Sequence, residues 1–147
     1  MSNKLNLDQL AAQHAQEIVK NAAPSSGKKG SEEAKAADIL ITKALGVLQE
    51  NGVYACMLFL LSRTREEDKN VARAVRSELL GELRKLNSEL RFGWQVPANG
   101  SEPATVLKFY SDTLADNLDE LLLVKGLYEQ TLIYARYGAK ARAELGG

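Results

Sequence analysis

The chain has 147 residues, and its 19 basic and 19 acidic side chains cancel to a formal net charge of zero. This length suits one domain with a real core, and the charge balance excludes a protein that is strongly basic over its whole surface, as many nucleic-acid binders are. A single cysteine, Cys56, excludes a disulfide framework within the chain.

Apolar residues recur at helical spacing through most of the chain, and alternation at period two is absent. The pattern predicts an all-α fold in which residues 1–147 form a single compact bundle of five to six helices. Asn6 is expected to cap the first helix, which ends near Asn21. The Pro, Ser and Gly residues from about 23 to 30 then predict a flexible connector.

A second helix is expected to begin at Ser31, with Glu32 and Glu33 in its first turn, where acidic side chains favour the helix dipole. It stops before the Asn-Gly pair at residues 51–52. The nearly all-apolar run of residues 53–61 is far shorter than the roughly twenty residues that span a bilayer, so no membrane is expected as a partner. We interpret the run as a third helix, the central rod of the bundle, wrapped by protein on most sides.

The sequence Thr-Arg-Glu-Glu at residues 64–67 has the form of a capping box, and it predicts the start of a long fourth helix that ends at about Arg91. Residues 92–102 predict a loop that carries two aromatic side chains. Helix resumes near Pro103, which the first turn of a helix tolerates. It continues toward the C-terminus with a possible break near residues 111–112.

The fourth helix sorts its side chains into three sectors when each residue is placed at a step of about 100°. The expected core stripe is apolar and consists of Ala72, Val75, Leu79, Leu83, Leu86 and Leu90. One flank, called the basic edge below, consists of Lys69, Arg73, Arg76, Arg84 and Arg91. The other flank, called the acidic edge, consists of Glu67, Glu78, Glu82 and Glu89.

Three interpretations of these edges remain open. An exposed helix carries such charges for solubility, with Glu78 and Glu82 near Lys85. Alternatively, the basic edge follows a phosphate backbone, where cationic side chains release counterions and give affinity without sequence choice. In the third interpretation, the basic edge of one copy meets the acidic edge of the next and builds a head-to-tail row.

The last helix interleaves tyrosines with basic residues, namely Tyr128, Tyr134 and Tyr137 with Lys125, Arg136, Lys140 and Arg142. Such a pattern is found where single-stranded RNA stacks its bases on aromatic rings. It is also typical of a core or a subunit contact in which the tyrosine hydroxyl stays solvated. Both interpretations stay open, and Arg136 and Lys140 are candidate RNA contacts.

No residue pattern indicates catalysis. His14 is the sole histidine and is expected to be a packed or partly exposed helix residue, while Cys56 is expected to be a small buried hydrophobe. With no metal-ligand cluster and no cofactor motif in the sequence, we expect no metal, no cofactor and no enzyme activity. The polar residues 1–10 lack the apolar core of a signal peptide, which predicts a cytoplasmic protein.

Several parts of the chain carry a resemblance to one family. Asn51-Gly52-Val53, followed by Met57, Phe59 and Leu60, resembles the Asn-Gly-Leu…Leu-Ala-Phe-Leu core segment of the Cmr-type small subunit of type III-B CRISPR effector complexes. Val124-Lys125 and Arg136-Tyr137 resemble the closing helix of that family. The opening helix, residues 8–19, and the connector before Ser31 lie where the family places theirs.

The resemblance implies a small, all-helical, non-enzymatic subunit. Its copies stack along a guide-RNA complex and hold the guide–target RNA duplex through sugar-phosphate contacts, while other subunits cut the RNA. The implied partners are guide RNA and target RNA, the backbone and large subunits, and other copies of the chain. Arg136 matches the closing motif directly. A helical adaptor with protein partners only is the alternative, because it would share every fold-level feature.

Overall fold

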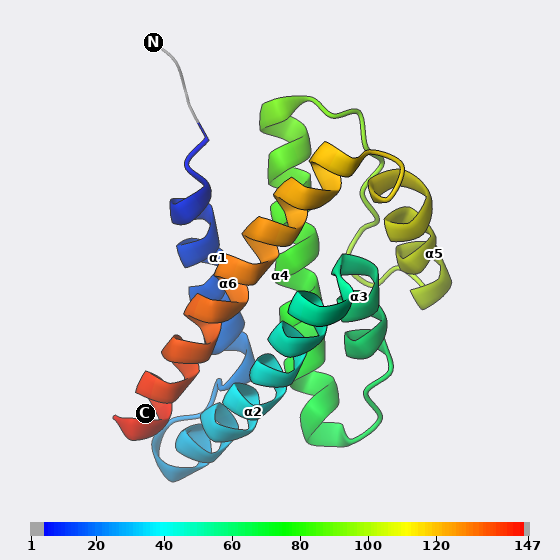
Figure 1. Ribbon diagram of the computed structural model, residues 1–147. Helices are drawn as coiled ribbons and strands as arrows, with labels where there is room; N and C mark the ends of the chain where they lie inside the picture. The colour runs from blue at the N-terminus through cyan, green and yellow to red at the C-terminus, as the bar shows by residue number, and fades with distance from the viewer. Residues whose placement is uncertain (1–4, 146–147) are drawn as a thin grey trace.

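The computed structural model describes residues 5–145, which form six α-helices and one π-helical turn and contain no strand (Figure 1). The predicted all-α bundle is therefore confirmed. The elements are α1 (Leu7–Ala22), α2 (Gly27–Asn51), α3 (Val53–Leu61), α4 (Glu66–Leu90), α5 (Pro103–Lys108), the π-helical turn η1 (Phe109–Leu114) and α6 (Leu118–Glu144).

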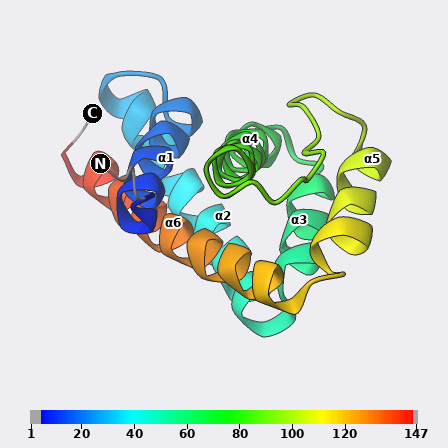
Figure 2. The same ribbon diagram turned by 90° about the horizontal axis from the view of Figure 1, so that it is seen from above.

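The long helices α2, α4 and α6, together with α1, build the body of the molecule. Helix α6 packs along α2 and α1, and α1 in turn packs along α4. Seen from above, α4 lies between α1 on one side and α3 with α5 on the other (Figure 2). Two fully buried tyrosines mark the centre: Tyr110 Oη lies 2.6 Å from Tyr128 Oη, which donates to the carbonyl oxygen of Leu79 (3.1 Å).

Several helix ends lie where the sequence predicted them. Asn6 caps α1, since its side chain accepts from Gln9 N–H (3.0 Å), and the helix ends at Ala22. Gly52 separates α2 from α3 with φ = 96°, a left-handed conformation that glycine adopts without strain. Pro103 opens α5, as expected for a residue with no N–H to leave unpaired.

The segment before α2 differs from the prediction, because helix already begins at Gly27. The predicted flexible connector from 23 to 30 is thus reduced to four residues, 23–26, which are held from the far end of the chain. The Arg142 guanidinium of α6 donates to the carbonyl oxygens of Ala23 (3.2 Å) and Ser25. Tertiary contacts of this kind override the weak helix propensity of glycine.

Ser31 does not cap α2, since Ser26 occupies the N-cap position one turn earlier. Instead the Ser31 hydroxyl donates to the carbonyl oxygen of Ala143 in the last turn of α6 (2.8 Å). The Glu33 carboxylate reaches back and accepts from the Ser25 N–H (3.0 Å). These polar side chains therefore join the start of α2 to its surroundings, a role that spacing along one helix does not reveal.

The apolar helix α3 is not the central rod of the bundle. Its buried side chains, Val53, Cys56, Met57 and Leu60, face the core. On its other side Tyr54 is 42% exposed and Leu58 is 46% exposed. Helix α3 lies at the edge of the molecule next to α5 (Figures 1 and 2), so its uniform hydrophobicity does not reflect burial on all sides.

Three local predictions concern the ends of α4 and the start of α6, and one of them is wrong. The capping box at residues 64–67 does not form, because Arg65 is the N-cap residue and makes no side-chain capping bond. Loop 92–102 is present as predicted. The regular α-helix is interrupted around residues 111–112 as expected, because α5 ends at Lys108 and the π-helical turn η1 follows. Helix α6 then begins at Leu118, where Asn117 acts as the cap by accepting from Glu120 N–H (3.0 Å).

Candidate nucleic-acid interface

Helix α4 carries most of the residues that the sequence singled out, and its core stripe is largely as predicted. Ala72, Val75, Leu79, Leu83 and Leu86 are buried, whereas Leu90 is 44% exposed at the end of the helix. The main correction concerns the acidic edge, since Glu82 is completely buried. It lies between α4 and α6, where the sequence predicted a solvated flank.

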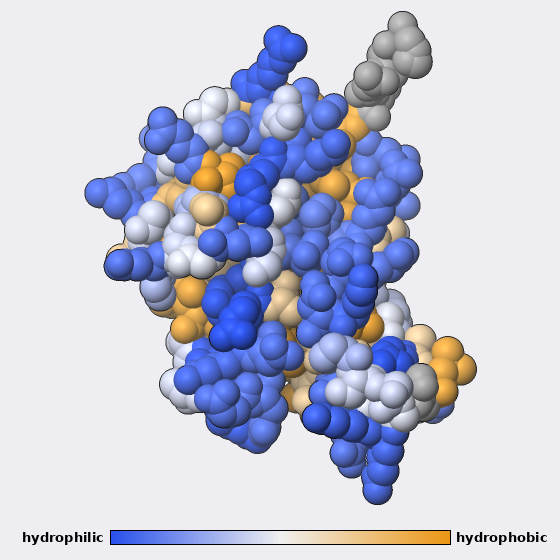
Figure 3. All heavy atoms as spheres, turned by 180° about the vertical axis from the view of Figure 1, so that it is seen from behind, coloured by the Kyte–Doolittle hydropathy of each residue, from blue (hydrophilic) through white to orange (hydrophobic). Residues whose placement is uncertain are grey.

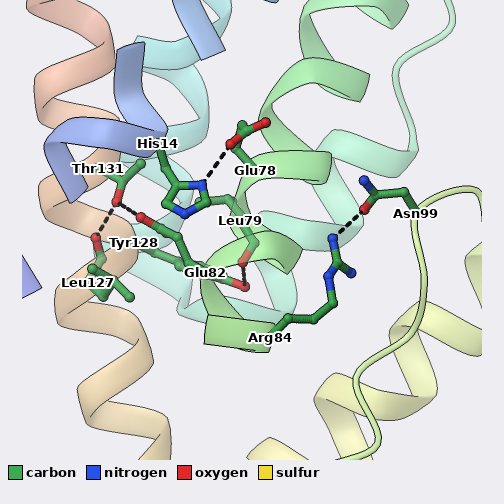
Figure 4. Close-up of polar contacts among 9 residues, drawn as sticks. All are labelled: His14, Glu78, Leu79, Glu82, Arg84, Asn99, Leu127, Tyr128 and Thr131. Atoms are coloured by element: carbon green, nitrogen blue, oxygen red, sulfur yellow. Dashed lines mark hydrogen bonds and ion pairs between the residues drawn. The ribbon is translucent and has the colours of Figure 1, made fainter. Parts of the chain in front are cut away.

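Burial raises the pKa of Glu82 well above its ordinary value, and the neighbouring charge of Glu78 acts in the same direction. The nearest polar group is the hydroxyl of Thr131, 2.5 Å from Oε2, while Oε1 has no hydrogen-bond partner within residues 5–145. Figure 4 shows this contact between the two helices. Glu82 is therefore part of the core and is unavailable to a partner.

The other three residues of the acidic edge each lie close to a basic side chain. Glu78 accepts from the His14 ring of α1 (2.7 Å), so this side of α4 faces a neighbouring helix (Figure 4). The carboxylate oxygen Oε2 of Glu89 lies 3.6 Å from Nζ of Lys85. Glu67 pairs with Arg65. Of the acidic edge, Glu78 and Glu82 therefore face neighbouring helices, while Glu67 and Glu89 stay at the surface.

The basic edge is divided by the loop 92–102. Nζ of Lys69 lies 3.8 Å from Oε1 of Glu66. An exposed ion pair of this kind is weak. Arg73 is exposed and Arg76 is half-buried, and within residues 5–145 neither side chain takes part in an ion pair or a hydrogen bond. Arg73 and Arg76 are therefore two neighbouring uncompensated cations on this edge.

Arg84 lies under the loop and holds it. Its guanidinium donates to the carbonyl oxygen of Pro97 (3.0 Å). It also donates to Asn99 Oδ1 (3.0 Å), as Figure 4 shows. Arg91 lies just beyond α4 in a left-handed conformation (φ = 56°), exposed to solvent. Of the five basic-edge residues, the structure thus gives Arg84 an internal role.

A hollow of about 330 Å³ separates the uncompensated arginines from the loop. Arg73, Arg76 and Ser77 of α4 form one wall, the turn of residues 98–101 forms the other, and the floor is apolar, with Leu61, Leu80 and Val106. The pKa of Arg76 is lowered, first by burial and then by the charge of Arg73, so the two guanidinium groups repel each other. This wall is the strongest feature for binding an anion.

Figure 3 shows the face opposite to that of Figure 1, where hydrophilic side chains cover most of the surface and apolar ones are visible between them. Such a mixed surface has no broad apolar area that would by itself define an interface. The site is defined by uncompensated charge at one hollow.

The candidates on α6 border different neighbours. Arg136 lies 3.8 Å from Asp38 of α2 and 5.9 Å from the ring centre of Tyr137, and Lys140 is exposed. Tyr128 is buried in the core and the hydroxyl of Tyr134 bonds to Asp8, so Tyr137 (62% exposed) is the ring free for stacking. The hollow beside Arg73 contains neither Arg136 nor Lys140 among its lining residues.

The sequence did not single out the turn that faces the arginines. Its composition, Ala-Asn-Gly-Ser, is typical of a turn, and Gly100 has φ = 87°. Nothing local indicated that it folds back onto α4, because that depends on Arg84 and on the buried Trp94.

The lone cysteine and the lone histidine lie in different surroundings. Cys56 is buried and its thiol contacts the carbonyl oxygen of Ala44 (3.6 Å), while His14 contacts Glu78, so the two do not form a nucleophile pair. Within residues 5–145 no cluster of three or more His, Cys, Asp or Glu side chains is arranged to hold a metal ion. No helix in that same range has both the length and the apolar character to cross a bilayer.

Comparison with models of protein families, with curated proteins and with solved structures finds no match to this chain.

Proposed function

We propose that this protein is a non-catalytic small subunit of a type III CRISPR ribonucleoprotein in the cytoplasm, and that it contacts the backbone of the guide–target RNA without reading its sequence. The observation that carries the proposal is the pair Arg73 and Arg76, two neighbouring cations without a carboxylate partner among residues 5–145. The family resemblance of residues 51–60 and of the Arg136-Tyr137 pair supports the same function.

Physically, such a subunit adds rigid length and local positive charge to the complex. Arginine forms paired hydrogen bonds with phosphate oxygens, and a guanidinium stays charged at any physiological pH. Contacts to phosphate give affinity and position but carry no sequence information. The neutral total charge of the chain fits this role, since neighbouring subunits would supply most of the binding and this one a local grip.

The proposal is tested with the complex isolated from its native cells. Reversal of charge at both Arg73 and Arg76 to Glu should weaken retention of target RNA and flatten its salt dependence. The slope of log K against log salt should fall by about one for each lost contact. A matched variant with Lys28 and Lys35 changed to Glu makes the same change in net charge on the exposed side of α2. Equal salt slopes for the two variants would refute the role of the α4 edge.

A helical adaptor with protein partners only is the second candidate function. It is favoured by the large apolar side chains that stand exposed on α2 and α6, with Ile39 at 59%, Leu118 at 66% and Leu122 at 56%. Side chains of this kind often mark contacts with other proteins. The absorbance ratio at 260 and 280 nm of the native assembly separates the candidates, because an adaptor without RNA gives the ratio of protein alone.

A further inference from the structure

The hollow between α4 and the turn of residues 98–101 differs from other hollows of the described surface in its charge balance. The hollow between α2 and the start of α4 is lined by both signs, including Lys29, Glu33 and Asp68. In the groove between α1 and α6 the cation is Arg142, whose Nε and Nη2 already donate to backbone oxygens. The hollow beside Arg73 and Arg76 has two cations and no acidic residue in its lining.

Hydrogen bonds within the chain hold the walls of this hollow in place. Arg84 fixes the loop through Pro97 and Asn99 (both 3.0 Å). The turn is closed by Ser101, whose hydroxyl (2.7 Å) and N–H (3.1 Å) both donate to the carbonyl oxygen of Ala98. A preformed site loses less conformational entropy on binding than one that must be ordered by its ligand.

Trp94 anchors the loop at a second place. The side chain of Asn87 bonds to both the N–H and the carbonyl oxygen of Trp94 (2.8 Å each), and the indole N–H donates to Glu120 (2.9 Å). Trp94 is buried and stacks on Phe92, with ring centres 4.6 Å apart. The wall that faces the arginines is therefore tied to α4 and α6 and is not a loose surface loop.

We propose that this hollow is a binding pocket for one phosphate ester group, held by Arg73 and Arg76 with the hydroxyl of Ser77 beside them and the attached sugar against the apolar floor. A volume of about 330 Å³ accommodates a ligand of this size. The inference rests on the proposed function for the source of the phosphate, which is then an RNA strand. Arg84 is a positioning residue of this pocket and does not touch the ligand.

The pocket is tested with purified protein and two probes, adenosine 5′-monophosphate and a ten-residue oligouridine, whose binding is followed through the backbone amide signals of Gly100 and Ser101. Ser77→Asp places a carboxylate beside the two arginines and should weaken both probes at least tenfold. Ser77→Asn is the matched control, with the same shape and no charge, and should bind within about twofold of the wild type. Equal thermal midpoints of the two variants show that folding is unaffected.

The outcomes separate the pocket from the proposed function. If both probes move the Gly100 and Ser101 signals in the wild type but not in Ser77→Asp, the result supports the pocket and the proposed function. If the mononucleotide moves these signals and the oligouridine does not, the pocket stands, but the proposed contact of Arg73 and Arg76 with an RNA strand fails. If neither probe moves them, or if Ser77→Asp binds as Ser77→Asn does, the pocket is overturned.

Discussion

Thr131 of α6 places its hydroxyl oxygen 2.5 Å from the buried carboxyl group of Glu82 and 2.9 Å from the carbonyl oxygen of Leu127. A hydroxyl has one proton and can donate to one of these oxygens. Both contacts are satisfied when Glu82 is protonated and donates to Thr131, which then donates to Leu127. Burial raises the pKa of Glu82, which agrees with this protonation state.

A raised pKa predicts how stability depends on pH. An acid whose pKa is higher in the folded state binds more protons when folded, so the free energy of unfolding falls as pH rises above the unfolded-state pKa. Glu82→Gln keeps the donor toward Thr131 and cannot ionise. We expect it to unfold at a higher urea concentration than the wild type at pH 8, with a difference that shrinks toward pH 5.

The comparison isolates Glu82 because every other titrating group, including Glu78 and His14 nearby, is present in both proteins. Urea unfolding of the two proteins at three or four pH values between 5 and 8 measures the difference in their free energies of unfolding. A difference that stays constant over this range would mean that Glu82 is an ionised carboxylate in the folded protein.

The partner of Glu82 gives a second prediction. Thr131→Val keeps the shape of the side chain and removes the hydroxyl, which leaves the buried carboxyl group without a hydrogen bond. Loss of a partner for a buried polar group costs about 1–3 kcal/mol. Thr105→Val is the control, since Thr105 is exposed on α5, and it should change the free energy of unfolding by less than about 0.5 kcal/mol. Similar values for both variants would contradict the proposed hydrogen bond.

The predictions from the sequence that proved correct are those that depend only on residues close together along the chain. Asn6, Gly52 and Pro103 act on the residues next to them, so their roles as cap, break and helix start follow from local chemistry. Glu82 was assigned to the wrong environment because one helical face does not reveal which side a second long helix covers. The periodicity placed it on the polar flank, and α6 packs over that position.

The candidate site was predicted in part for the same reason. The spacing of Arg73 and Arg76 places them on one side of α4 whatever else the chain does. Which basic residue stays free was not predictable, since Arg84 is taken up by a loop that lies 13 and 15 residues further along the chain at Pro97 and Asn99. The facing wall of the hollow is thus a property of the tertiary fold.

Two glycines of α2 should respond to alanine in opposite ways. A Cβ at Gly30 would collide with the carbonyl oxygen of Ser25, whereas a Cβ at Gly46 would meet open space. Gly46→Ala should stabilise the protein by about 0.5–1 kcal/mol, because alanine has less conformational freedom to lose. Gly30→Ala should destabilise it by about 1–3 kcal/mol. Urea unfolding of both variants measures the pair, and stabilisation by Gly30→Ala would show that the connector moves aside freely.

The lone thiol should be inert in the folded protein. Burial raises the pKa of Cys56 to about 12, so almost no reactive thiolate exists at pH 8. We expect no reaction with a disulfide reagent over hours in buffer, and reaction of one thiol per chain after denaturation in guanidinium. Rapid labelling of the native protein would show that α3 opens frequently from the core.

A conservative variant of Arg84 distinguishes a role in positioning the loop from a direct contact with RNA. Arg84→Lys keeps the positive charge but lacks the planar fork that donates to Pro97 and Asn99 at once. If Arg84 positions the loop, Arg84→Lys and Arg84→Met should both speed hydrogen exchange at Gly100 and Ser101 and weaken binding of the oligouridine to a similar degree. If Arg84 contacts phosphate through its charge alone, the lysine variant should bind RNA nearly as well as the wild type while the methionine variant does not.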